Sequence, residues 1–144
     1  MKLLAPLLVL VAGCGMMGLG DADIWAASQS DNVEAITKFL SEGVHVEAKD
    51  GQGNTPLHMA ARGNATKAIA FLISKGANPN APNNEGLTPL VVAVTSDQDE
   101  AVTALLDNGA NPNGVGQGRT PLSYSIAFEN KVIEDILRSR GARE

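Results

Sequence analysis

Apolar residues recur along most of this chain with the spacing of one helical face. In four short stretches they follow one another at steps of one or three residues, which places them on the same side of a helix. The stretches contain Val33, Ile36, Phe39 and Leu40; Ala68, Ile69, Leu72 and Ile73; Ala101, Val102, Leu105 and Leu106; and Val132, Ile133, Ile136 and Leu137. The pattern predicts short amphipathic helices, each burying one apolar stripe.

A second kind of helix is predicted by three threonines that precede proline and leucine. The segments Thr55-Pro56-Leu57, Thr88-Pro89-Leu90 and Thr120-Pro121-Leu122 begin 33 and 32 residues apart. Threonine is a good N-cap, and proline is tolerated at the first helical position because its missing N–H would be unpaired there anyway. Each Thr-Pro step therefore predicts a helix start, ahead of one apolar stripe.

Turns and glycines divide the predicted helices. Polar turns at 28–31, 62–64 and 95–97 separate the two helices of a pair and predict a fresh N-cap for the second one. A glycine follows each apolar stripe, where a helix ends in the left-handed conformation that only glycine adopts freely. These glycines are Gly43, Gly76, Gly109 and Gly141.

The two kinds of helix combine into a repeated unit. The last three of these glycines each lie 21 residues after a capping threonine, and the same count back from Gly43 places a degenerate first start at Ala22. The motif Thr55-Pro56-Leu57-His58 and the period of about 33 residues resemble the ankyrin repeat. The resemblance covers 22–144 and implies an all-α ankyrin solenoid, in which each unit has a β-turn finger and two antiparallel helices. The predicted units are 22–54, 55–87, 88–119 and 120–144.

The composition agrees with a stack of thin helices. Hydrophobic residues make up 44% of the chain but aromatic residues only 3%, so the core must consist largely of Ala, Leu, Val and Ile. A single unit has too little core to fold alone, and three or more must stack. We expect polar outer faces on the two end units, with Glu34 and Lys38 at one end and Glu134, Asp135, Arg138 and Arg140 at the other.

The N-terminal segment is of a different kind. Lys2 is followed by the apolar run 3–12, which is too short for a membrane span but suits the hydrophobic region of an export signal. The run ends in Val11-Ala12-Gly13-Cys14, which resembles the bacterial lipobox, where the cysteine thiol is acylated. We therefore predict a lipoprotein signal peptide over 1–13, lipidation of Cys14, a tether over 14–21 and a lipid-anchored, periplasm-facing protein of the bacterial envelope.

Two alternatives remain for this segment. An ordinary signal peptide could be cut near 18–20, which would give a soluble periplasmic or secreted protein. Alternatively, the uncharged stretch 3–20 could stay as an N-terminal membrane anchor. All three interpretations export the repeats.

Charge and residue inventory exclude several classes of function. The 11 Lys and Arg against 16 Asp and Glu give a net charge of −5, which argues against nucleic-acid binding and favours a protein partner with a basic surface. One cysteine cannot form an internal disulfide, and with two histidines it offers little for a metal site. We expect no cofactor, no metal and no enzymatic activity.

Two features invite a catalytic interpretation. The resemblance implies that His58 has a structural role, hydrogen-bonded to Thr55 and neighbouring backbone. The glycine-rich segment 114–118 resembles a phosphate loop, but it lacks the Gly-Lys-Ser/Thr end and a preceding strand. We interpret it as a flexible finger in which the repeat has lost one residue, so that Val115 takes the position of Asp50 and Asn83.

The resemblance implies that partners bind a concave face made by the finger tips and the exposed positions of each first helix. Met59, Val92 and Tyr124 are equivalent and would form an apolar stripe, although Val92 and Tyr124 could instead pack against neighbours. Asp50 could likewise serve only its own turn. The candidate partner-binding residues are Met59, Arg62, Val92, Thr95 and Tyr124 in the helices, and Asp50, Gln52, Asn84, Glu85 and Gln117 at the tips.

These observations favour a non-catalytic protein–protein interaction module in the bacterial envelope. The protein is expected to be a monomer before it binds its partner, and to reach the membrane through its N-terminal lipid. The alternative is an immunity or inhibitor protein that neutralises an envelope-acting toxin or enzyme.

Overall fold

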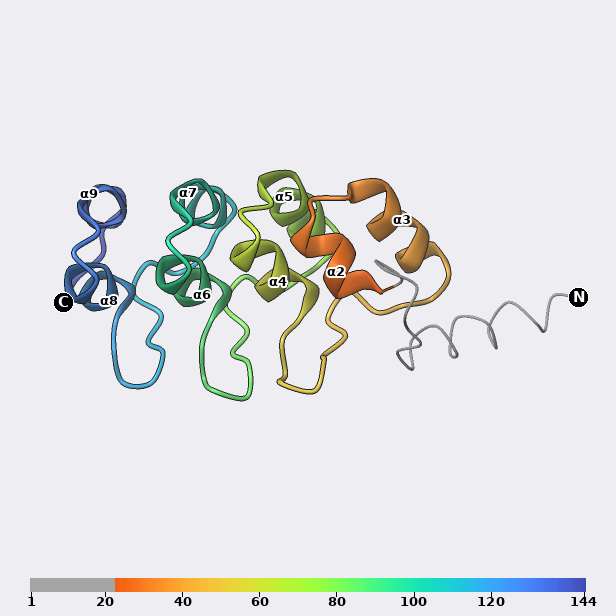
Figure 1. Ribbon diagram of the computed structural model, residues 1–144, viewed down its shortest axis with the longest axis horizontal. Coiled ribbons are helices and arrows are strands. Elements are labelled where there is room, and N and C mark those ends of the chain that lie inside the picture. Colours follow the sequence, from red (N-terminus) through yellow and green to blue (C-terminus); the bar gives the residue numbers. More distant parts are fainter. Residues whose placement is uncertain (1–22) are drawn as a thin grey trace, which may run out of the picture.

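A computed structural model describes residues 23–144, which form eight α-helices in four antiparallel pairs (Figure 1). The signal segment, Cys14 and the tether lie outside the described residues. The first helix of each pair is α2 (Ile24–Gln29), α4 (Pro56–Arg62), α6 (Pro89–Thr95) or α8 (Pro121–Ala127). The second is α3 (Val33–Ser41), α5 (Thr66–Ser74), α7 (Asp99–Asp107) or α9 (Lys131–Ser139).

The helices stack in two rows. The inner helices α2, α4, α6 and α8 contact one another in sequence, and the outer helices α3, α5, α7 and α9 do the same (Figure 1). Long loops between successive pairs project beyond the inner row as fingers, all on the same side. Between residues 23 and 144 the only β-pairing is one isolated bridge, from Gly116 to Arg119. The predicted all-α repeat fold is confirmed.

The inner helices α4, α6 and α8 begin at the predicted threonines. The hydroxyl oxygens of Thr55, Thr88 and Thr120 accept hydrogen bonds from the backbone N–H three residues later, at 3.4, 3.3 and 3.1 Å. A proline occupies the first turn of each of these helices. The four glycines that end the outer helices have φ between +87° and +99°, as predicted.

The caps of two outer helices come from the preceding unit. No side chain of their own N-cap residue caps α5 or α7. Instead, Asp31 Oδ1 accepts from the Ala68 N–H at 2.7 Å, and Asn64 Oδ1 accepts from the Ala101 N–H at 2.8 Å. Both acceptor residues have positive φ, which suits Asp and Asn in a tight turn. The prediction that each turn caps its own helix is therefore wrong for these two helices, and the cap joins neighbouring units.

One continuous hydrophobic core runs through all four units. Leucines of the inner helices and apolar residues of the outer stripes are fully buried in it, including Leu57, Ile69, Leu72, Leu90, Leu105, Leu122 and Leu137. The predicted burial therefore holds for most stripe residues. It is wrong for Val132, which is 57% exposed because its position corresponds to Lys67 and Glu100 on the solvent side of the outer helices. Because neighbouring units share this core, the surface positions of successive units are held in fixed relation to one another.

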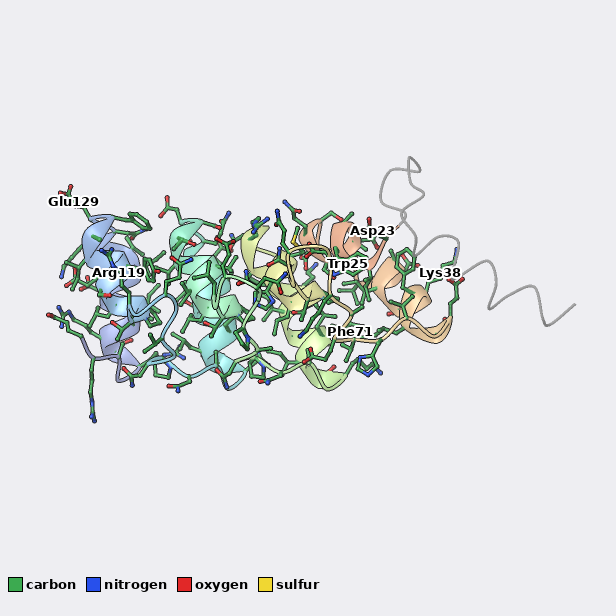
Figure 2. The ribbon with its side chains drawn as sticks, turned by 90° about the horizontal axis from the view of Figure 1, so that it is seen from below. Asp23, Trp25, Lys38, Phe71, Arg119 and Glu129 are labelled. Atoms are coloured by element: carbon green, nitrogen blue, oxygen red, sulfur yellow. The ribbon has the colours of Figure 1, made fainter. Side chains whose placement is uncertain are left out.

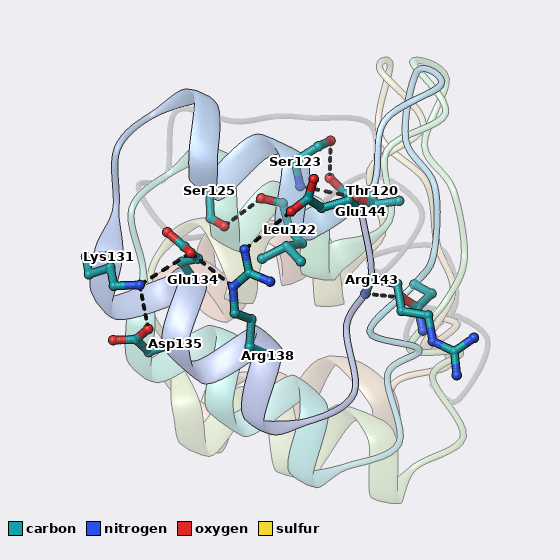
Figure 3. A network of polar contacts seen from close by, with 11 residues as sticks. Thr120, Leu122, Ser123, Ser125, Lys131, Glu134, Asp135, Arg138, Arg143 and Glu144 are labelled. Carbon is teal, nitrogen blue, oxygen red and sulfur yellow. Dashed lines mark hydrogen bonds and ion pairs between the residues drawn. The ribbon is translucent and has the colours of Figure 1, made fainter.

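The outer face of the last unit is polar, as expected for an end unit (Figure 3). Ser123, Glu134 and Arg138 occupy the positions that His58, Ile69 and Ile73 hold in the second unit. The Glu134 carboxylate accepts from the Arg138 Nε at 3.0 Å and from the Lys131 Nζ at 3.3 Å, and Arg138 also reaches Glu144. Ion pairs therefore replace the apolar contacts that an interior unit makes at these places.

Candidate protein-binding surface

The candidate surface, here called the finger face, consists of the finger tips and the exposed positions of the inner helices. The first two fingers are joined at their tips, where the Asn84 N–H donates to the Gln52 carbonyl at 3.1 Å. Gly53 has φ +77°, and a Cβ there would lie 2.7 Å from the Asn84 backbone nitrogen. Only glycine permits this approach, so the two tips form one connected surface.

Two polar side chains at the finger tips serve their own turns. Asp50 Oδ1 accepts from the backbone N–H groups of Gln52 and Asn54 at 2.8 and 2.9 Å. Asn83 Oδ1 makes the equivalent bonds in the second finger, to Glu85 and Leu87. The turn-forming alternative therefore describes Asp50, and its carboxylate is largely occupied within the finger.

The third finger differs from the expected alignment. In the first two fingers the backbone N–H groups of Asp50 and Asn83 donate to the backbone carbonyl four residues later. The Gly116 N–H makes the corresponding bond to the Arg119 carbonyl, only three residues later. Gly116, and not Val115, thus takes the position of Asp50 and Asn83. The missing residue falls at the tip, where Gln117 and Gly118 both have positive φ, as a two-residue turn of type I′ requires.

The predicted apolar stripe is not exposed. Val92 is only 3% exposed and Tyr124 only 8%, while Met59 is half-buried. The Tyr124 hydroxyl donates to the Gly116 carbonyl in the shortened finger at 3.0 Å, and the Arg119 guanidinium lies over the Tyr124 ring. An exposed stripe is therefore wrong for Val92 and Tyr124, and the packing alternative is correct.

The geometry of paired helices and fingers agrees with a comparison of sequences. A family model described as ankyrin repeats (3 copies) matches residues 24–116, which is more than half of the chain. The chain belongs to the ankyrin-repeat family. Ankyrin repeats are generally protein–protein interaction modules. A comparison with curated proteins gave no match.

The remaining candidate residues lie on the finger face of these ankyrin units. Arg62, Thr95, Gln52, Asn84, Glu85 and Gln117 are all exposed. The fingers and inner helices carry four basic residues, Lys49, Arg62, Lys75 and Arg119, against four acidic ones, Glu42, Glu47, Asp50 and Glu85. The finger face is therefore close to neutral, although the chain as a whole is acidic.

His58 is a structural residue of the second ankyrin unit. Its side chain is fully buried, the Nδ1 atom accepts from the Thr55 N–H at 3.1 Å, and the Nε2 atom donates to the Leu87 carbonyl at 2.9 Å. The carbonyl can only accept, which fixes the proton on Nε2. Burial lowers the pKa of His58, since it disfavours the charged imidazolium. The predicted hydrogen bonding to Thr55 and to backbone is confirmed.

The described part of the chain contains no group of three or more His, Cys, Asp or Glu residues arranged to hold a metal ion. Within residues 23–144, no helix has the length and apolar character that a membrane span requires.

Sequence reasoning missed a feature at the other end of the inner helices. An open pocket of about 430 Å³ lies between the α6–α7 turn and the α8–α9 turn. Two of its lining residues, Phe128 and Val132, are each 57% exposed. An alignment of the units would have revealed them, because the equivalent residues in the other three units are small or charged.

Proposed function

We propose that this protein binds another protein through the finger face and has no catalytic activity. One observation carries the proposal: exposed side chains at equivalent positions of successive units lie on one face of a single continuous core. Arg62 and Thr95 are equivalent in the second and third units, and Asn84 and Glu85 lie at the tip of the finger that connects these two units. Such a surface offers one variable patch per unit without rearrangement of the fold.

We propose further that the protein acts in the bacterial envelope, anchored by a lipid on Cys14. The support is the sequence of 1–20 alone, with its basic start, its apolar run and its lipobox-like end. Mass spectrometry of the mature N-terminus tests this location. A diacylated or triacylated Cys14 is expected, and an unmodified start near Asp21 would leave only the exported, soluble alternative.

Site-specific photocrosslinking tests the finger face. A photoreactive amino acid at Arg62 or Asn84 is expected to trap a partner in the native cells. The same amino acid at Ala70 is not expected to trap it, because Ala70 is also exposed but lies on the outer helix of the same unit. Equal capture from all three positions, or capture only from Ala70, would contradict a finger-face interface.

Pull-down from envelope extract, followed by activity assays of the captured proteins, separates the two forms of the proposed function. An inhibitor or immunity protein binds one partner tightly at equal stoichiometry and abolishes the activity of that partner. A scaffold instead captures several partners and leaves their activities unchanged.

A further inference from the structure

The turn edge, defined here as 30–34, 63–67, 96–100 and 128–132, lies at the end of the inner helices away from the fingers. Its residues have equivalent positions in all four units. Where the last unit has Phe128, the others have Ser30, Gly63 and Ser96; where it has Val132, they have Glu34, Lys67 and Glu100. Both exceptions occur in the same unit, and both place a large apolar side chain in solvent.

These two side chains line the open pocket described above. Phe128 and Val132 line the pocket of about 430 Å³ together with Val94 and Thr95 from the preceding unit. The Phe128 ring lies 6.3 Å from the Tyr124 ring, which is itself fixed by its hydrogen bond to the Gly116 carbonyl. The Phe128 ring therefore packs against a fixed Tyr124 ring, which gives the exposed apolar surface a defined shape.

The turn edge that carries the pocket is acidic. Six carboxylates lie along the turn edge, against two lysines. The carboxylates are Asp31, Glu34, Asp97, Asp99, Glu100 and Glu129, and the lysines are Lys67 and Lys131. Lys131 is engaged by Glu134 and Asp135, at 3.3 and 3.0 Å. Asp97, Glu129 and Lys131 border the pocket itself, and Glu129 projects from this edge in Figure 2. Because Lys131 is already paired, Asp97 and Glu129 are the carboxylates available to a bound cation.

We infer that this pocket docks a segment of a partner protein in which a bulky apolar side chain is flanked by Lys or Arg. The apolar side chain covers Phe128 and Val132, and the flanking cations meet Asp97 and Glu129. A second copy of this chain is disfavoured as the occupant, because it would bring one acidic edge against another. The pocket adjoins the finger face at Thr95, but its apolar centre, Phe128 and Val132, lies outside that face. The inference therefore holds whether or not the finger face binds a partner.

The test uses a short dye-labelled peptide with a central Trp between Arg and Lys residues. Fluorescence anisotropy measures its affinity for the full chain, and ¹⁵N NMR locates the binding. We expect amide shifts to centre on Phe128, Glu129 and Val132. A peptide with Ser in place of Trp, and one with Glu in place of each Arg and Lys, should both bind more weakly.

The decisive protein is the double variant Phe128→Ser, Val132→Glu, which takes the residues that Ser96 and Glu100 provide in the third unit. It should unfold at the same temperature as the parent chain or higher, yet lose about tenfold or more in affinity, since these two side chains form the apolar centre of the contact. Val115→Ser is the matched control, because Val115 is 53% exposed but lies in the third finger. This control should leave the affinity unchanged.

Four results would overturn the inference. The first is equal affinity of the parent chain and a folded double variant. The second is a set of NMR shifts that centre on the finger face. The third is equal binding of the acidic peptide, which would remove the charge selection. The fourth is self-association by sedimentation equilibrium that the double variant abolishes, which would assign the pocket to a second copy of the chain.

Discussion

The second and fourth units have the same backbone arrangement but differ at the face that points toward the C-terminal end of the stack. In the second unit this face packs against the third unit, and in the fourth it is exposed to solvent. In the second unit, His58 and Ile69 are fully buried beneath the third unit. At the equivalent places in the fourth unit, Ser123 and Glu134 are only partly buried. The capping threonine, the proline and the terminal glycine are common to both units. These local signals define the helix pair, and a few side chains then decide whether the face is interior or exposed.

Glu134 shows how a charge is tolerated at a position that is apolar in interior units. The Arg138 side chain donates to its carboxylate, which lowers the pKa of Glu134 and keeps it ionised. In the second unit the equivalent pair is Ile69 and Ile73. The same two positions thus make either an apolar contact with a following unit or an ion pair in water.

The largest difference between interior and end units is expected when a buried leucine of an interior unit is truncated. Leu90→Ala or Leu105→Ala should each destabilise the chain by about 2–5 kcal/mol, because both side chains are buried between neighbouring units. Val132→Ala should cost much less, since Val132 is 57% exposed. Chemical denaturation monitored by circular dichroism measures all three. Equal losses would contradict a linear stack in which interior units depend on neighbours on both sides.

A smaller effect is expected at His58. His58→Ala should cost about 1–3 kcal/mol beyond the lost packing, because it leaves the Thr55 N–H and the Leu87 carbonyl without their partner. Ser123→Ala, at the equivalent position of the last unit, provides the comparison. Thermal unfolding should rank the first variant as clearly less stable, and the reverse order would refute the structural role of His58.

The caps between units are expected to contribute less again. Asn64→Gly removes the acceptor of the Ala101 N–H and should cost roughly 1 kcal/mol, the usual value for a helix cap. Glycine is preferred to alanine here because Asn64 has φ +56°. Hydrogen exchange at the Ala101 amide should accelerate, whereas exchange at Ala68, capped by Asp31, should change little.

The smallest effect concerns pH. The pKa of His58 lies below its ordinary value of 6.5 in the folded chain, so the unfolded chain binds more protons as the pH falls through this range. The stability contribution of neutral His58 is therefore complete above pH 6.5 and is lost as the pH falls toward the lower folded-state pKa. His58→Val, which copies Val91 of the third unit, should flatten this part of the profile. An unchanged profile would mean that His58 is not the group that titrates.

Much of the fold could be predicted because the rules that fix it are local. Thr55, Thr88 and Thr120 start helices, and the glycines end them, whatever lies beside them. The register of Gly116 and the hydrogen bond that its carbonyl accepts from Tyr124 could not be predicted in this way, because both involve a finger shortened by one residue. The caps from Asp31 and Asn64 also escaped prediction, since they join residues of different units.

Part of the candidate site could also be predicted, because some of its positions follow from local turn signals that recur in each unit. Exposed tip residues such as Gln52 and Asn84 follow from turn positions that recur in each unit. The pocket beside Phe128 depends on a departure from the repeat, and its signal is visible only when the units are aligned with one another.

The polar contacts between units also give the array a direction. Five backbone N–H groups donate to a side chain of the preceding unit, and in each case the acceptor comes earlier in the chain. The donors are those of Ala68, Asn78, Ala101, Asn111 and Arg143. During synthesis, the acceptor residues of each unit are therefore translated before the N–H groups that will bind them. Shortening the protein from its carboxyl end would leave these donors satisfied in every unit that remains, whereas deleting the first unit would strand those of the second.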